Sequence, residues 1–266
     1  MRVSGRRVLV TGASRGIGAE LARAFAGAGA RVALVARSEG ALKELAGDLD
    51  GEAFPADLCD GEQVAGLIGR VEAEAGPVDV LVNNAGSEAV GWFPALDPAT
   101  IDATYKLNLL APAQLCRQAI PRMLERGGGH IVNVSSMADV VAGPGLATYS
   151  STKAGLTHLT AGLRADLRGL PVKTTVVEVG MVPTDMADRL YTYEPTGKGL
   201  RRLYRMRLLT DVAKERVAEA TVAAVEHERR FVRLPRRNVP LHVLAEAPRR
   251  VLELSLTGLR HQDYVH

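Results

Sequence analysis

The sequence predicts a single α/β domain in which a doubly wound parallel sheet carries helices on both faces, followed by a C-terminal helical extension. Short apolar runs alternate with helical segments, a glycine-rich turn follows the first run, and polar residues stand where later runs end. With 266 residues, 47% of them hydrophobic, the chain can bury a large core without disulfides. We expect residues 1–240 to form the domain, with a substrate loop at about 185–210, and residues 241–266 to pack on it as the extension.

The composition argues against several classes of protein. Cys59 and Cys116 lie far apart and match no metal or redox spacing, and the six histidines show no ligand spacing, so we predict reduced thiols and no metal. No apolar run approaches membrane-spanning length, and the N-terminus leads straight into a strand, which predicts a cytoplasmic protein. Basic residues gather in 201–207 and 229–250 without interleaved aromatics, so we expect a solvated face and no nucleic-acid partner.

The first element is the strand Val8–Val10, which ends in a glycine turn. Gly12, Gly16 and Gly18 lie in this turn, and a helix follows over residues 19–28. Glycines between a strand and a helix allow a dinucleotide pyrophosphate to approach the backbone at the helix N-terminus. The spacing Gly-x-x-x-Gly-x-Gly departs from the general fingerprint, and a turn that merely joins strand to helix is the alternative.

The second strand, residues 31–36, ends in Ala36, and Ser38 can cap the helix that follows to Asp48. A protein that selects NAD usually carries an acidic residue at this strand end, to bind the ribose 2′-hydroxyl. Here Arg37 follows Ala36, and Arg15 in the glycine turn could reach the same region. The two arginines would pair with a 2′-phosphate, unless both are ordinary solvated side chains.

Polar residues follow the next strands at the same predicted edge of the sheet. A strand near residues 52–55 ends at Asp57 and Leu58, and after a helix over 61–75 the strand 78–82 ends at Asn84, Ala85 and Gly86. In open α/β sheets, ligands bind outside the carboxyl ends of the strands. Asp57 and Asn84 are therefore candidate ligand residues, with ordinary turn or cap roles as the alternative.

The remaining elements complete the alternation. A long helix over 98–125 carries Asn108 among leucines, where an amide is costly unless bonded, so Asn108 is either a satisfied core residue or a site residue. The strand 130–134 delivers Ser135 and Ser136, and a helix begins near Tyr149. A strand over 173–179, a helix from Thr210-Asp211 to about residue 228 and a last strand over 230–234 follow.

Tyr149 and Lys153 are one helical turn apart, so their side chains lie on one face of the helix. Lowering a phenol pKa from about 10 to about 7 needs roughly 4 kcal/mol, which one positive charge at about 4 Å can supply. We therefore expect Lys153 to lower the pKa of Tyr149. The spacing alone is weak evidence, since both residue types are common on solvated helix faces.

Taken together and in this order, the motifs resemble those of the classical short-chain dehydrogenase/reductase family, from about Arg6 to Met186. The resemblance implies a Rossmann-like fold and a catalytic tetrad of Asn108, Ser136, Tyr149 and Lys153, with Ser135 structural. It also implies these cofactor-binding residues: Gly12, Ser14, Arg15, Gly16, Ile17, Gly18, Arg37, Asp57, Leu58, Asn84, Ala85, Gly86, Tyr149, Lys153, Val182 and Thr184.

The resemblance implies hydride transfer between a nicotinamide and a carbonyl or secondary alcohol. We expect NADP(H) to be the preferred cofactor and NAD(H) the second choice. The small-molecule substrate is expected to be a hydrophobic ketone, aldehyde or acyl compound. The protein is expected to form a dimer or tetramer. The rival is a catalytically silent binding or regulatory protein. The chain departs from the family at Glu178-Val179-Gly180, where Asn-Pro-Gly is frequent, and in its extension, which could cover the substrate entrance, pair with another subunit or, less favoured, contact a membrane surface.

Overall fold

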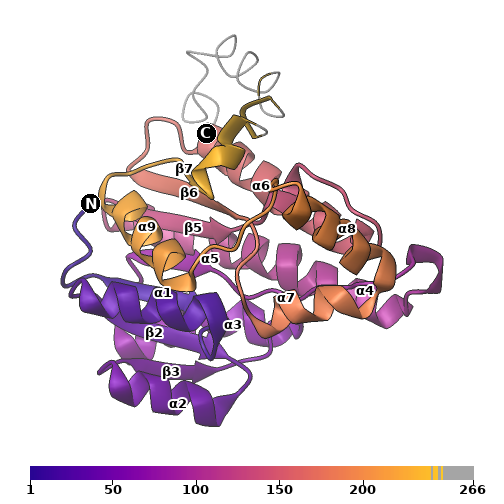
Figure 1. Cartoon of the computed structure of the whole chain (residues 1–266). Helices are drawn as coiled ribbons and strands as arrows, with labels where there is room; N and C mark the ends of the chain where they lie inside the picture. Colours follow the sequence, from indigo (N-terminus) through magenta and orange to yellow (C-terminus); the bar gives the residue numbers. More distant parts are fainter. Residues whose placement is uncertain (241, 245–246, 248–266) are drawn as a thin grey trace.

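The computed structural model describes residues 1–240, 242–244 and 247, and its strands form one parallel sheet in the order β3-β2-β1-β4-β5-β6-β7 (Figure 1). The predicted extension therefore lies largely outside the described residues. The strands are β1 (Arg7–Thr11), β2 (Arg31–Ala36), β3 (Glu52–Pro55), β4 (Val80–Asn83), β5 (Gly129–Val134), β6 (Val172–Val179) and β7 (Phe231–Leu234).

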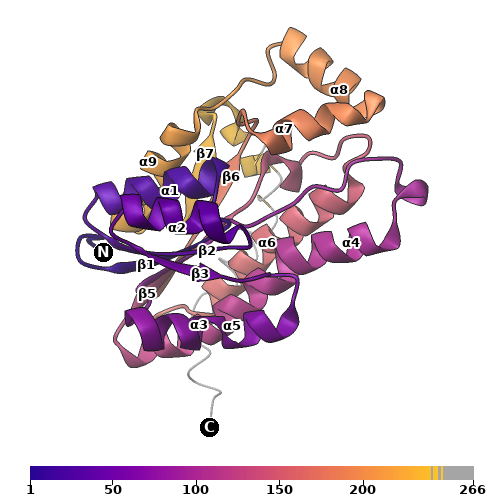
Figure 2. The same cartoon turned by 90° about the horizontal axis from the view of Figure 1, so that it is seen from below.

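Helices cover both faces of the sheet, as predicted, with α1, α2 and α9 on one face and α3, α4, α5 and α6 on the other (Figure 2). Side chains alternate across each strand, so Val8 and Val10 pack in the core under the first group while Leu9 packs in the core under the second. The helices are α1 (Gly16–Gly27), α2 (Glu39–Asp48), α3 (Gly61–Ala75), α4 (Pro98–Tyr105), α5 (Ala111–Glu125), α6 (Ala147–Asp166), α7 (Asp185–Arg189), α8 (Glu194–Arg205) and α9 (Lys214–Glu226).

The strand order reverses between β1 and β4, which are hydrogen-bonded neighbours with Val10 opposite Val82. The chain winds outward from β1 through β2 to β3 and, in the other direction, from β4 to β7. This reversal opens a crevice at the carboxyl ends of β1 and β4, where ligands bind in doubly wound sheets.

Three expectations need correction. The helix over 98–125 contains a π-helical turn, Lys106–Leu110, between α4 and α5. The last long helix begins at Lys214, because the carboxylate of Asp211 accepts a hydrogen bond from the hydroxyl of Tyr204 instead of capping it. Ser38 does precede α2, but its side chain makes no capping bond within the described part of the chain.

The predicted substrate loop consists of α7 and α8, joined by a 3-10 turn (Leu190–Thr192). These helices stand at one end of the molecule, away from the layers that cover the sheet (Figure 2). Among the described residues, no helix combines the length and apolar character needed to cross a bilayer.

Candidate active site

The glycine turn after β1 packs directly on the loop after β4. A Cβ atom on Gly12, whose φ is 65°, would lie 2.8 Å from the Cα of Ala85, and a Cβ on Gly18 would lie 2.1 Å from the carbonyl oxygen of Gly12. The side-chain amide of Asn84 donates to the carbonyl oxygens of Thr11 (3.0 Å) and Gly12 (3.3 Å). Only glycine allows this close approach, which fixes the shape of the turn.

Thr11, which begins the motif of the glycine turn, holds the two loops together, a role that the sequence did not predict. Its hydroxyl accepts hydrogen bonds from the backbone N–H groups of Asn84 (3.0 Å) and Ala85 (3.1 Å) and donates to the carbonyl oxygen of Val82 (3.2 Å). The sequence signal was a threonine at the end of a buried strand, next to the first glycine. The crevice between β1 and β4 is thus closed at its base by hydrogen bonds.

Helix α1 presents its N-terminus to this crevice. The first turn carries no acidic residue, and Arg15, which precedes it, makes no side-chain capping bond with the described residues. The backbone N–H groups and the positive end of the helix dipole can therefore receive a phosphate. A Cβ on Gly16 would lie 3.6 Å from the methyl group of Thr184, so the predicted Thr184 stands beside the turn.

The two arginines predicted to reach a 2′-phosphate differ in their surroundings. Arg37 is exposed just beyond β2, whereas the guanidinium of Arg15 pairs with the carboxylate of Asp185 at 2.8 Å. Their side chains are 70% and 68% exposed, and such pairs contribute about 0–1 kcal/mol, so a phosphate can compete for Arg15. Asp57 is held in place because its carboxylate accepts from the N–H of Cys59 (2.9 Å).

Tyr149 and Lys153 project from α6 toward the carboxyl end of β5. The ammonium of Lys153, a residue only 5% exposed, donates to the carbonyl oxygen of Val134 (2.9 Å) and lies 5.8 Å from the centroid of the Tyr149 ring. A Cβ on Gly86 would lie 3.5 Å from this ammonium and 3.3 Å from the side-chain oxygen of Asn108. The fold therefore brings Gly86, Asn108, Tyr149 and Lys153 to one place.

The two serines after β5 have different partners. The hydroxyl of Ser135 donates to the carbonyl oxygen of Lys153 (3.1 Å) and so fixes α6 to the sheet, in keeping with a structural role. The hydroxyl of Ser136 accepts from the N–H of Ala138 (3.1 Å) and forms a side-chain hydrogen bond with Tyr149 that lowers the pKa of the phenol. Ser136 is thus the serine that touches Tyr149.

The electrostatics correct one expectation. Burial, chiefly, raises the pKa of Tyr149 to about 12; the hydrogen bond from Ser136 opposes this rise, and the charges of Glu88 and Asp139 contribute to it. Burial lowers the pKa of Lys153 to about 8, and Asp139 opposes that fall. Lys153 does not lower the phenol pKa as expected, because a buried ammonium is itself costly and carboxylates lie near Tyr149.

Asn108 is fully buried in the π-helical turn and is a satisfied core residue, the first of the two alternatives predicted for it. Its amide nitrogen donates to the carbonyl oxygen of Ser87 (2.8 Å) and the hydroxyl of Thr152 (3.0 Å), and its oxygen accepts from the N–H of Ser87 (2.9 Å). The amide is satisfied, yet it stands beside Lys153. π-helical turns are frequent at functional sites, and this one aligns the loop after β4 with α6.

Sequence reasoning missed the buried charges next to the tetrad. Asp139 accepts from the hydroxyl of Thr157 (2.7 Å), and Glu178, the departure from the family motif, pairs with Arg233 of β7. The Nε2 atom of His242 lies 3.7 Å from a carboxylate oxygen of Asp139 and 3.7 Å from one of Glu178. Although ligand atoms of these three groups lie within 4.8 Å of one another, we assign no ion, because Arg233 already supplies positive charge to Glu178.

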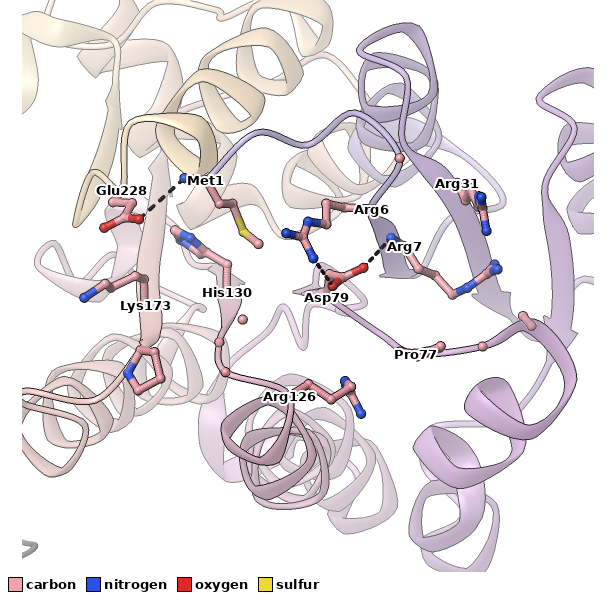
Figure 3. Close-up of a pocket in the computed structure, with 17 residues that line it drawn as sticks. Met1, Arg6, Arg7, Arg31, Pro77, Asp79, Arg126, His130, Lys173 and Glu228 are labelled. Carbon is pink, nitrogen blue, oxygen red and sulfur yellow. Dashed lines mark hydrogen bonds and ion pairs between the residues drawn. The ribbon is translucent and has the colours of Figure 1, made fainter.

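The opposite edge of the sheet also holds a pocket, of about 820 Å³ (Figure 3). Its basic lining is largely paired within the protein: Arg6 binds Asp79 (3.1 Å), while Arg7 and Arg126 bind Glu52 and Glu72. Arg31 and Lys173 lie at opposite sides of the view and do not converge. We assign this pocket no ligand.

The fold and site define a class of protein, one that holds a dinucleotide at a glycine turn beside a Ser-Tyr-Lys constellation. The model of the family named short chain dehydrogenase matches residues 6–194. The chain belongs to this family.

Named relatives include the ketoacyl reductase HetN of Nostoc sp., 38% identical over 185 residues, which are 68% of this chain and 64% of the relative. Carbonyl reductase 2 of Sus scrofa, whose name gives NADPH, is 36% identical over 214 residues, covering 80% of this chain and 86% of the relative. The chain thus spans less than two thirds of the length of HetN.

Solved structures agree with the fold. A short-chain dehydrogenase from Streptomyces avermitilis has a TM-score of 0.79 at 31% identity, covering 95% of this chain and 96% of that one. A gluconate 5-dehydrogenase from Burkholderia cenocepacia, in complex with NADP and tartrate, has a TM-score of 0.77 at 27% identity, covering 87% and 94%. A family member from Burkholderia phymatum in complex with NAD has a TM-score of 0.78 at 25% identity, covering 96% of each chain.

Proposed function

We propose that the protein is an NADP(H)-dependent oxidoreductase that transfers a hydride between the nicotinamide and a carbonyl or secondary alcohol carbon. The observation that carries the proposal is the assembly of Asn108, Ser136, Tyr149 and Lys153 beside the glycine turn. A silent binding protein would gain nothing from keeping Lys153 in a position where burial lowers its pKa to about 8.

In the reducing direction, Tyr149 donates its proton to the oxygen of the carbonyl as that oxygen gains charge, and Ser136 donates a hydrogen bond to the same oxygen. A phenol with a pKa of about 12 is protonated at neutral pH. It is still a stronger acid than the alcohol that forms when the alkoxide takes up a proton, so the transfer from Tyr149 is favourable. Lys153 would hold the ribose hydroxyls of the nicotinamide, and Asn108 would keep the loop after β4 against α6. The cofactor, when bound, supplies the hydride.

The preference for NADP(H) rests on the end of β2. Ala36 leaves no carboxylate there to repel a 2′-phosphate, Arg37 is exposed beside it, and Arg15 can leave Asp185. NAD(H) is the second choice, since structural neighbours carry NADP or NAD.

The substrate is proposed to be a hydrophobic ketone, aldehyde or acyl compound, enclosed by α7 and α8. Tyr191, Tyr193 and Leu203 of this segment are partly buried, whereas Met206 and Leu208 are 48% and 58% exposed. A cytoplasmic homo-oligomer, with one domain over 1–240 and an extension over 241–266, completes the proposal by analogy with the family.

A turnover screen tests the function. Purified protein is mixed with NADPH or NADH and a panel of aliphatic and aromatic ketones, aldehydes and acyl thioesters, and nicotinamide oxidation is followed at 340 nm. We expect at least one apolar carbonyl compound to be reduced, faster with NADPH. If both cofactors bind and no carbonyl compound is reduced nor alcohol oxidised, the silent binding protein replaces the enzyme.

A further inference from the structure

Glu88 is a buried carboxylate beside the tetrad that the proposed chemistry does not use. It lies two residues beyond Gly86, and its side chain is only 5% exposed. One carboxylate oxygen accepts a hydrogen bond from Nε of Arg189, at the end of α7. The other, Oε2, is buried without a hydrogen-bond partner among the residues that the structure describes.

The backbone that carries Glu88 is fixed to the tetrad. Asn108 clamps the neighbouring residue Ser87 through both its N–H (2.9 Å) and its carbonyl oxygen (2.8 Å), and the same amide binds Thr152, next to Lys153. The backbone next to Glu88 is therefore held by the same amide that stands beside Lys153. The negative charge of Glu88 also raises the pKa of the Tyr149 phenol.

A buried carboxylate oxygen without a donor is costly, and such groups in native proteins are normally satisfied. Glu88 lies between the loop that carries Gly86, beside Lys153, and α7 of the predicted substrate segment, so a bound substrate is a natural source of the missing donor. A cationic donor is disfavoured, because Arg189 already neutralises Glu88 and would repel it. A neutral hydroxyl group meets both conditions.

We propose that Glu88 is a specificity residue whose free oxygen accepts a hydrogen bond from a hydroxyl group of the substrate, and that Arg189 of α7 holds the carboxylate in that orientation. The inference rests on the proposed function and narrows its substrate class to apolar carbonyl compounds that also carry a hydroxyl group. A site built to bind a hydroxyl discriminates strongly against analogues that cannot donate, because its own polar group is then left unpaired.

Two pairs of ketones test the inference: 1-hydroxy-2-heptanone against 1-methoxy-2-heptanone, and 4-hydroxy-2-heptanone against 4-methoxy-2-heptanone. Within each pair the chain and the oxygen substituent are matched, and only the donor is lost. We expect kcat/KM of the wild type to favour the hydroxy ketone of at least one pair by about tenfold to a hundredfold, the range of a hydrogen bond to a charged group.

Glu88→Ala should reduce this preference to within about threefold, and Glu88→Gln should give an intermediate value, since an amide oxygen is a weaker acceptor. The matched control is Glu219→Gln, an exposed glutamate on α9, which should keep the wild-type preference. Arg189→Ala should weaken the preference without abolishing it, because the carboxylate remains but is no longer held. Cofactor binding, followed by nicotinamide fluorescence, should be unchanged in both Glu88 variants and shows that they are folded.

The outcomes separate the two claims. If the wild type reduces these ketones without preferring either hydroxy compound, or if Glu88→Ala keeps the preference while still binding cofactor, the role of Glu88 is wrong and the enzyme stands. If the wild type reduces none of the four ketones but reduces an apolar carbonyl compound without a hydroxyl group in the turnover screen, the role of Glu88 is wrong and the enzyme stands. If the screen also shows no turnover, the proposed function falls together with this inference.

Discussion

Both edges of the sheet carry charged side chains, but these differ in burial and pairing. At the carboxyl edge, Lys153 is buried and Tyr149 is half-buried, and both have displaced pKa values. At the amino edge, Arg6 and Arg126 lie in ion pairs that remain in contact with solvent (Figure 3). Exposed pairs contribute little to stability, whereas buried groups with displaced pKa values are candidates for chemistry. The carboxyl edge, which we propose to be catalytic, is therefore distinguished from the amino edge by the burial of its ionisable groups and by their incomplete pairing.

The largest expected effect compares one substitution at each edge. Tyr149→Phe removes the proton donor and should lower kcat by about 10²–10⁴, with cofactor affinity retained. Arg6→Gln, which breaks the pair with Asp79 at the amino edge, should change kcat by less than about twofold. Steady-state kinetics and cofactor titration of both variants measure this; a Phe variant with near-normal turnover would remove Tyr149 from the mechanism.

His130 differs from the exposed ion pairs of the amino edge, because its side chain is fully buried. Burial, helped by the positive charges of the N-terminus and Lys173, lowers its pKa from 6.5 to about 3. Between these pH values the unfolded chain binds a proton that the folded protein does not, so the free energy of unfolding falls as the pH drops from 6.5 toward 3. The loss attributable to His130 between pH 7 and pH 4 is on the order of 3 kcal/mol.

His130→Gln keeps an N–H donor for the hydroxyl of Thr175, which the ring nitrogen binds at 2.8 Å, but cannot be protonated in this range. Its stability should therefore fall less steeply in acid than that of the wild type. Urea unfolding at pH 7, 5 and 4 gives both curves. Parallel curves would show that His130 does not control acid stability.

The cofactor preference can be tested along one strand that joins the two edges. Ala36→Asp together with Arg37→Ala, at the carboxyl end of β2, should invert the preference for NADPH, since each arginine bond to a phosphate contributes about tenfold to a hundredfold. Arg31→Ala, at the amino end of the same strand, is the matched control and should leave it unchanged. The ratio of kcat/KM values for NADPH and NADH decides; a wild type that prefers NADH would refute the assignment.

The smallest expected effect concerns Asp139, whose charge raises the pKa of both Lys153 and Tyr149. Asp139→Asn should move the alkaline limb of the kcat/KM profile to lower pH by less than one pH unit, because the ammonium loses its proton more readily. Glu228→Gln, at the amino edge, should leave the profile where it is. We assign this alkaline limb to the loss of the Lys153 proton, and a limb that moves to higher pH would contradict that assignment.

The sequence predicted the features that depend on local pattern. The glycine turn, the strands and the order of the motif residues follow from spacing and periodicity, so the class of fold, the family and the family's candidate site residues were accessible without coordinates. The direction of the Tyr149 pKa shift was wrong because burial and the nearness of Glu88 and Asp139 depend on tertiary packing. The roles of Thr11 and Arg189 were missed for the same reason, since their partners lie 71–74 and 101 residues away in the chain.

The π-helical turn at Lys106–Leu110 amounts to one extra residue set into an otherwise continuous helix. Removing a single residue there would restore regular α-helical bonding, so α4 and α5 could both persist. The widened turn absorbs the extra residue, so α4 and α5 keep nearly the relative orientation of one continuous helix. The deletion would instead narrow the turn itself, and Asn108 in its middle would move away from Ser87 and Thr152, to which it is now hydrogen-bonded. The alignment of the site therefore depends on the length of this turn as well as on the identity of its residues.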